Sequence, residues 1–174
     1  MQRVIDQTSN VELLCDAIVD RYHASLQEAL PRIRDEMLSM NAAGASPFME
    51  MLRHAFDELA EQIESHLAKE EHLLFPAIAA LSIAEREGAR RPPLAFATVL
   101  HPIRFMEAEH VRIEMAVEQL RELARVVAEP DTLSPNWQRC MADLAKLDSE
   151  LREHHRTENE VLFPRALELE RRLF

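Results

Sequence analysis

The sequence contains few glycine, cysteine and aromatic residues. Among its 174 residues are two glycines and two cysteines, and aromatic side chains account for 5%. Cys15 and Cys140 form neither a CxxC pair nor a disulfide framework, so we expect two reduced thiols embedded in helices. No segment approaches the roughly 18 consecutive apolar residues of a membrane-spanning helix.

Positive charge is also scarce. The chain has 20 Lys and Arg against 31 Asp and Glu, a net charge of −11 with histidine neutral. Without a basic stretch to follow phosphates, binding to nucleic acid or to an anionic membrane is not expected. The first residues, 1–6, lack the apolar run of a signal peptide, and we therefore expect a soluble cytoplasmic protein.

Helix-forming residues dominate the rest of the composition. Apolar residues make up 47% and charged residues 29%, as in a helical bundle. We expect a single domain over 1–174 with its core at about 10–168. Helical patterns begin at Ser9, which forms a capping box with Glu12, and at Ser46, which precedes Pro47. Four helices are predicted, at about 9–40, 46–86 and 102–129 and from about 135 almost to the C-terminus, with a linker over 88–98.

Proline interrupts three of these patterns. Pro31 is expected to bend the first helix, while Pro76 and Pro164 should kink the second and the fourth. Strand-like alternation is not present. Four helices with three connections predict an all-α, up-down-up-down four-helix bundle.

One motif occurs twice at matched spacing. His66-x-x-x-Glu70-x-x-x-Leu-Phe-Pro returns 88 residues later as His154-x-x-x-Glu158-x-x-x-Leu-Phe-Pro. Two further histidines, His23 and His110, lie 87 apart. The chain therefore consists of two similar halves, which predicts two helix pairs folded around a shared site.

Each of these four histidines interrupts an apolar stripe. Residues seven apart on a helix differ by only about 20° in azimuth, so they share a face. The flanking residues at this spacing are Leu59 and Leu73 for His66, Ile103 and Val117 for His110, Leu147 and Val161 for His154, and Asp16 and Leu30 for His23. Such stripes face inward in a bundle, and the four imidazoles should meet there.

The chemistry of these residues indicates a metal site. Glu70 and Glu158 follow their histidines by four residues and share their faces. Because buried carboxylates are rarely left unpaired, the group requires a common cation. Structural zinc usually takes four ligands including cysteine, and calcium and magnesium prefer oxygen. Mixed imidazole and carboxylate donors favour a pair of iron ions, with manganese or zinc as substitutes.

A third His-x-x-x-Glu adds one candidate ligand. Glu114 lies four residues after His110, where the first half has Gln27, and it is either a ligand or a carboxylate at the rim. We expect His23 and His66 to bind one ion, with His110, His154 and Glu114 on the other. Glu70 and Glu158 would bridge the two ions, leaving an open position for water, O2, NO or peroxide.

The remaining polar residues near the motifs are expected to stay outside the ligand set. Helical azimuth directs four histidines away from the site: His54, His72, His101 and His155. Glu71 should be solvated for the same reason. Asp20 and Glu107, each three residues before a site histidine, are either acceptors that orient His23 and His110 or ordinary surface acids.

The order His, His-x-x-x-Glu, His, His-x-x-x-Glu resembles the hemerythrin-like (HHE cation-binding) family over about residues 10–168. The resemblance implies a four-helix bundle with a non-haem di-iron centre at His23, His66, Glu70, His110, His154 and Glu158. Members of the family carry or sense O2, respond to NO or handle iron. Several strings, including Arg21-Tyr22-His23 and Glu158-Asn159, are similar to bacterial di-iron proteins that repair damaged iron–sulfur clusters.

The chain departs from these relatives at a few positions. Repair proteins have a cysteine-containing segment before the bundle and a fifth histidine where this chain has 39–46, and hemerythrins place theirs where this chain has Glu114. The resemblance implies a protein that binds or senses O2 or NO, or handles iron under oxidative or nitrosative stress. The alternative is a di-iron redox enzyme or repair factor, so enzymatic activity stays open. A signalling role would require a protein partner or a homodimer.

Overall fold

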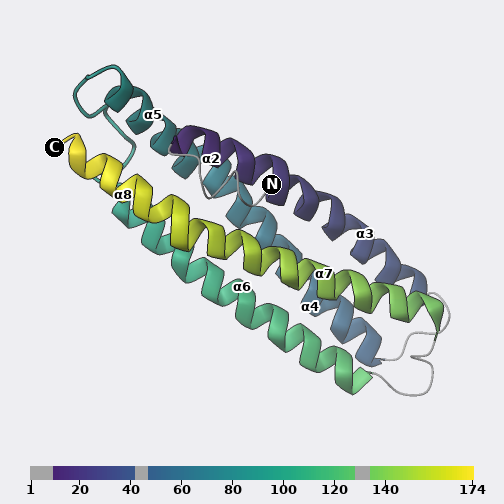
Figure 1. Cartoon of the computed structure of the whole chain (residues 1–174). Helices are drawn as coiled ribbons and strands as arrows, with labels where there is room; N and C mark the ends of the chain where they lie inside the picture. Colours follow the sequence, from purple (N-terminus) through teal and green to yellow (C-terminus); the bar gives the residue numbers. More distant parts are fainter. Residues whose placement is uncertain (1–9, 42–46, 128–133) are drawn as a thin grey trace.

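The computed structural model describes residues 10–41, 47–127 and 134–174. Within these ranges the chain is helical apart from turns and the connection that follows Arg86, and no strand occurs. Four long helical segments lie side by side, each antiparallel to the next along the chain (Figure 1). The predicted all-α, up-down-up-down four-helix bundle is confirmed.

Three of the four segments consist of two α-helices joined by a π-helical turn. In chain order they are α2 (Val11–Ile18), η1 (Val19–His23) and α3 (Ala24–Asn41); α4 (Pro47–Lys69), η2 (Glu70–Leu74) and α5 (Phe75–Arg86); and α7 (Pro135–Thr157), η4 (Glu158–Leu162) and α8 (Phe163–Arg172). The third segment is a single helix, α6 (Leu100–Val127). It begins two residues before the predicted start at Pro102.

Short polar side chains cap two of the segments. The Asn10 side chain accepts a hydrogen bond from the backbone N–H of Glu12 at 2.9 Å, so α2 begins at Val11. Ser134 accepts one from the N–H of Trp137 at 3.2 Å and caps α7. The caps expected at Ser9 and Ser46 lie outside the described residues.

The interruptions expected at Pro76 and Pro164 take the form of π-helical turns. The N–H of Phe75 bonds to the carbonyl of Glu70, and that of Phe163 to the carbonyl of Glu158, each five residues back. A proline ring clashes with the carbonyl four residues before it. A wider turn immediately before the proline moves the preceding carbonyls aside, so the helix continues beyond it.

These turns shift the register of the buried face by one residue. Leu73, seven residues after His66, is 55% exposed, whereas Leu74 is 1% exposed. In the first segment, the turn η1 likewise leaves Asp16 exposed and buries Cys15. The strict spacing of seven therefore fails next to the turns. It holds along α6, which has no π turn and buries both Ile103 and Val117.

The apolar core is divided into two clusters. One lies at the end of the bundle that holds α3, α4, the second half of α6 and the first half of α7. The other lies among α2, α5, the first half of α6 and α8. Between them, every one of the four segments contributes polar side chains, and neither cluster includes the four predicted site histidines.

One buried carboxylate fixes the connection that leads into α6. Glu170 of α8 is 4% exposed and accepts hydrogen bonds from Arg91, from the Thr98 hydroxyl at 2.5 Å and from the N–H of Val99 at 3.1 Å. The N–H groups at a helix start have no partner within the helix, so an acceptor at this point stabilises the first turn. Glu170 thereby joins the linker and the start of α6 to α8.

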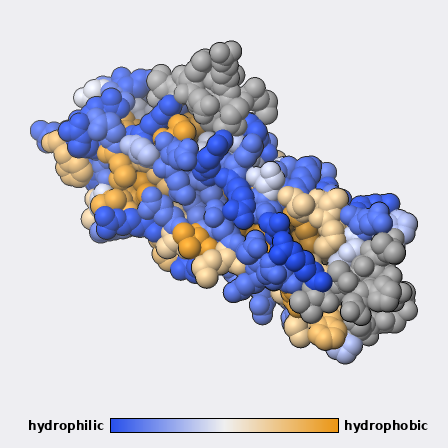
Figure 2. All heavy atoms as spheres, turned by 60° about the horizontal axis from the view of Figure 1, so that its bottom comes forward, coloured by the Kyte–Doolittle hydropathy of each residue, from blue (hydrophilic) through white to orange (hydrophobic). Residues whose placement is uncertain are grey.

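The outer surface is mostly hydrophilic, with separate apolar patches, on the face that Figure 2 turns forward. Several large apolar residues are exposed on α6, such as Phe105, Val111 and Met115. Among the described residues, no helix is both long and apolar enough to cross a membrane.

Both cysteines are free thiols within the packed core, as expected. Burial, followed by the negative charge of Glu36, raises the pKa of Cys140 to about 12, and burial also raises the pKa of Cys15. Because the thiolate is the reactive species, we expect both thiols of the folded protein to react with a maleimide at pH 8 at least about 100-fold more slowly than free cysteine. Mass spectrometry of labelled protein measures this, with denatured protein as the control. Rapid labelling of either thiol in the folded state would contradict the packing described above.

Candidate metal centre

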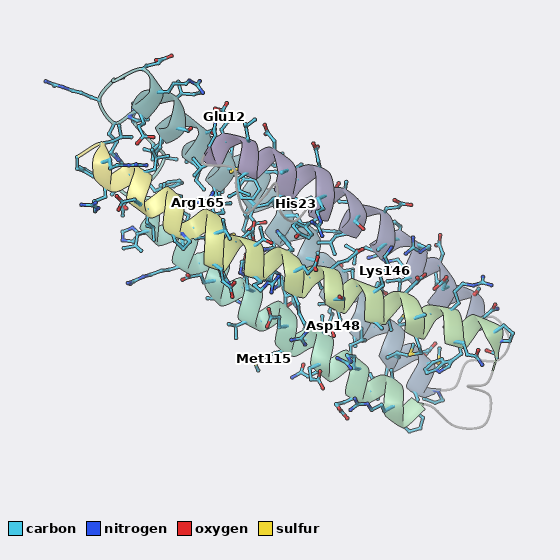
Figure 3. The ribbon with its side chains drawn as sticks, in the orientation of Figure 1. Glu12, His23, Met115, Lys146, Asp148 and Arg165 are labelled. Atoms are coloured by element: carbon cyan, nitrogen blue, oxygen red, sulfur yellow. The ribbon has the colours of Figure 1, made fainter. Side chains whose placement is uncertain are left out.

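Six polar side chains fill the layer between the two apolar clusters. Each is at most 1% exposed, and all four segments contribute: His23, His66, Glu70, His110, His154 and Glu158. Three of the six belong to π turns, because His23 ends η1 while Glu70 and Glu158 begin η2 and η4. In Figure 3, His23 lies at this level of the bundle, with other side chains gathered around it. The structure therefore brings these predicted residues together.

The four histidines form two pairs. The Nε2 atoms of His23 and His154 are 3.3 Å apart, and those of His66 and His110 are 3.1 Å apart. The sequence-based assignment of His23 with His66 differs from this arrangement. Pairs form where η1 packs against α7 and where α4 packs against α6, which sequence spacing does not reveal.

Each carboxylate faces both pairs. Glu70 places Oε1 3.3 Å from Nε2 of His66 and Oε2 3.4 Å from Nε2 of His23. Glu158 places Oε1 3.2 Å from Nε2 of His154 and Oε2 3.2 Å from Nε2 of His110. Each histidine pair thus has two carboxylate oxygens beside it, one from each glutamate.

The donor set fits metal ions better than it fits a hydrogen-bond network. All four oxygens of Glu70 and Glu158 are buried without a hydrogen-bond partner among the described residues. A buried carboxylate without compensation is strongly destabilising. Around an ion with ligand distances near 2.1 Å, adjacent donors lie about 3.0–3.4 Å apart. Six separations within the two groups are 3.1–3.4 Å and match that geometry, while those from Glu70 to Nε2 of His154 and of His110 are longer, 3.6 and 3.8 Å.

Histidines and carboxylates compensate one another electrostatically. Burial alone would lower the pKa of His110, but Glu158 and Glu70 raise it to about 9. Burial would raise the pKa of Glu158, but His154 and His110 hold it below its usual range. The centre therefore favours ionised carboxylates with positive charge beside them, which is the charge that a cation supplies.

Three of the histidines are oriented through their second ring nitrogen. Nδ1 of His23 lies 2.8 Å from Glu71, Nδ1 of His66 lies 3.2 Å from Glu109, and Nδ1 of His110 lies 3.0 Å from the Asn159 side-chain oxygen. An acceptor at Nδ1 places the proton there and leaves the lone pair of Nε2 directed at the centre. These contacts set the rings in a metal-binding orientation.

The acceptors differ from those considered in the sequence. Asp20 and Glu107 are exposed, while Glu71, which was expected to be solvated, contacts His23 across the bundle. The sequence repeat could have revealed two of these acceptors. Glu71 follows Glu70 and Asn159 follows Glu158, 88 residues apart, and each meets the first histidine of its own half.

Glu114 does not join the six residues. Its carboxylate is 37% exposed and accepts a hydrogen bond from Nδ1 of His155 at 3.0 Å. His155, which was expected to point away, is 1% exposed, and a ring nitrogen of it lies within 4.8 Å of those of His66 and His110. A helix packed between two neighbours buries an arc of 100° or more, so two consecutive residues can both face inward. Burial lowers the pKa of His155, and His110 lowers it further.

The other histidines behave as predicted. His54, His72 and His101 are all exposed. None of them occurs in a cluster of metal-binding side chains within the described part of the chain.

Comparison with known proteins agrees with this geometry. The family model of the hemerythrin HHE cation binding domain matches residues 16–95 and 101–172, which together are most of the chain. The chain belongs to the hemerythrin HHE family. This membership, together with the clustered histidines and glutamates, makes it a cation-binding domain of the kind that binds iron.

Curated relatives are similar over most of this HHE chain. The iron-sulfur cluster repair protein YtfE of Edwardsiella ictaluri is 32% identical over 157 residues, covering 88% of this chain and 65% of the relative. The protein of the same name from Salmonella typhimurium is 30% identical over 156 residues, with the same coverage. The chain thus spans 65% of the length of these relatives.

Removing one donor should disable the centre. We expect His66→Ala and Glu158→Ala each to reduce bound metal to half or less of the wild-type content, because each residue is one of the six clustered metal-binding side chains. Loss of bound metal should also lower the melting temperature of metal-loaded protein.

Elemental analysis and thermal unfolding measure these two effects. His72→Ala is the matched control, since His72 is exposed and lies two residues from Glu70. Wild-type metal content in both site variants would show that these residues do not bind metal.

Proposed function

We propose that this domain holds two iron ions. His23 and His154 bind the first ion, His66 and His110 bind the second, and Glu70 and Glu158 bridge them. The observation that carries the proposal is the pair of fully buried glutamates, whose four oxygens have no hydrogen-bond partner among the described residues. Mixed nitrogen and oxygen donors around two ions are typical of di-iron carboxylate proteins.

Two cations account for the charge of the centre better than one. Glu70 and Glu158 are each 0% exposed and their like charges repel, so the charge of Glu158 acts to raise the pKa of Glu70. A single ion at one histidine pair would leave an oxygen of each glutamate without a partner at the other pair. Two ions give every one of the four oxygens a cation.

We further propose that the centre binds a small diatomic ligand, O2 or NO, or peroxide, and that the protein handles iron under oxidative or nitrosative stress. Bound iron supplies redox chemistry and affinity for such ligands. The protein surrounds the centre with two apolar clusters that exclude water, and it orients three imidazoles through Glu71, Glu109 and Asn159.

Repair of damaged iron–sulfur clusters is the second candidate. It is favoured by relatives that carry the name iron-sulfur cluster repair protein and are 30–32% identical to this chain. Because the chain spans 65% of their length, their activity is a proposal for this domain. Both candidates depend on the same six residues.

Titration with NO tests the first candidate. We expect the reduced, iron-loaded protein to bind NO stoichiometrically under anaerobic conditions, with a new visible absorption band. His66→Ala should lose this band in proportion to its loss of iron. If iron-loaded wild-type protein shows no spectral change with NO or O2, the centre does not bind diatomic ligands.

Reactivation of a damaged enzyme tests the second candidate. An enzyme with a [4Fe–4S] cluster is inactivated by NO and then incubated with iron-loaded protein. Recovery above that given by an equal amount of free Fe²⁺, and lost in Glu158→Ala, would support repair. Equal recovery with free Fe²⁺ would exclude it for this domain.

A further inference from the structure

The helix α6 exposes apolar side chains on the side opposite its buried face. Val111 and Met115 are 58% and 59% exposed, and Ala108 is also exposed. Figure 3 shows Met115 on the outer side of α6, away from the other helices. Valine forms helices less readily than alanine or leucine, so the stability of α6 alone does not explain an exposed valine in the middle of the helix.

Charged residues continue this apolar stretch in both directions along α6. Steps of three and four residues in alternation stay on one face of a helix, as in a coiled coil. On this face they give the outer strip, which consists of Arg104, Ala108, Val111, Met115, Glu118 and Glu122. All six residues are exposed. Positive charge therefore precedes the apolar residues, and negative charge follows them.

The charges of the outer strip are available to a partner. Arg104 forms no ion pair within the described part of the chain. Glu118 lies 3.6 Å from Arg121, and Glu122 contacts Arg125, each on its own helix. Exposed pairs of this kind stabilise a protein little, so the two glutamates can turn to new partners at small cost.

The order of these charges determines which partner fits and in which direction. Beside a second, parallel α6, Arg104 would face Arg104 and Glu122 would face Glu122, so like charges would repel. An antiparallel pair centred on residue 113 brings Arg104 opposite Glu122 of the second copy. The same register brings Met115 opposite Val111 of the second copy. The outer strip is therefore complementary to itself when one copy is reversed.

We propose that the outer strip is a dimerisation surface, on which α6 of a second copy of this chain packs in an antiparallel, twofold arrangement. Each contact then occurs twice, with Met115 against Val111 at the centre and Arg104 paired with Glu122 at both ends. The strip lies outside the metal centre, so the proposal does not depend on the proposed function. Because the apolar part is small, we expect a dissociation constant on the order of 50 µM.

Sedimentation velocity of the full chain measures this association. Wild-type protein should be mostly dimeric at about 0.5 mM and mostly monomeric at about 5 µM. Met115→Glu buries a charge twice at the centre of the interface and should weaken association at least about 10-fold. Leu13→Glu is the matched control, because Leu13 is 56% exposed but belongs to α2. It should associate like wild-type protein, and both variants should keep the wild-type helicity and iron content.

Exchange of charges tests the antiparallel direction. Arg104→Glu and Glu122→Arg each bring like charges together at both ends, so each variant alone should associate about 10-fold more weakly. In an equal mixture of the two variants, opposite charges meet again at both ends, and a mixed dimer should form with wild-type affinity. A substitution that acted only on the stability of its own helix would not be rescued by mixing.

Three results would overturn the proposal. Wild-type protein that stays monomeric at about 0.5 mM would exclude a second copy as the occupant of the strip. Dimerisation that Met115→Glu leaves unchanged would place the interface elsewhere on the chain. Failure of the mixed variants to associate would exclude the antiparallel register. Iron binding is measured separately, so none of these results bears on the proposed di-iron centre.

Discussion

The burial of two carboxylates, Glu70 and Glu158, is the constraint on which the centre depends. Both are 0% exposed, and their four oxygens face histidine nitrogens at 3.2–3.4 Å without forming hydrogen bonds. An apolar layer in their place would make a more stable bundle, because charge is costly to remove from water. The chain therefore contains a polar layer between two apolar clusters, and in the function that we propose, metal ions compensate for its cost.

The π-helical turns explain how one helix can present both a ligand and a packed core. In the second and fourth segments the turn begins at Glu70 or Glu158 and ends one residue before Phe75 or Phe163, each of which precedes a proline. The added residue rotates the rest of the helix, so that Leu74 and Leu162 face the apolar cluster. The Leu-Phe-Pro motif that follows each His-x-x-x-Glu thus belongs to the geometry of the centre as well as to the core.

The sequence was sufficient to predict the bundle and to identify six residues that the structure brings together. Helical periodicity and the repeat carry that information, since residues on one face must meet when four stripes pack. It was not sufficient for features set by neighbouring helices. The pairing of His23 with His154 depends on which segments pack side by side, and the inward position of His155 depends on the width of the buried arc of α7. The exposure of Leu73 follows from a π turn that ideal helical spacing does not include.

The number of iron ions bound per chain tests the account most directly. Metal-free protein is titrated with Fe²⁺ under anaerobic conditions and analysed for iron after removal of the excess. The account predicts two ions per chain, because each of the two histidine pairs faces one oxygen of Glu70 and one oxygen of Glu158. A plateau at one ion, or no binding by correctly folded protein, would contradict it.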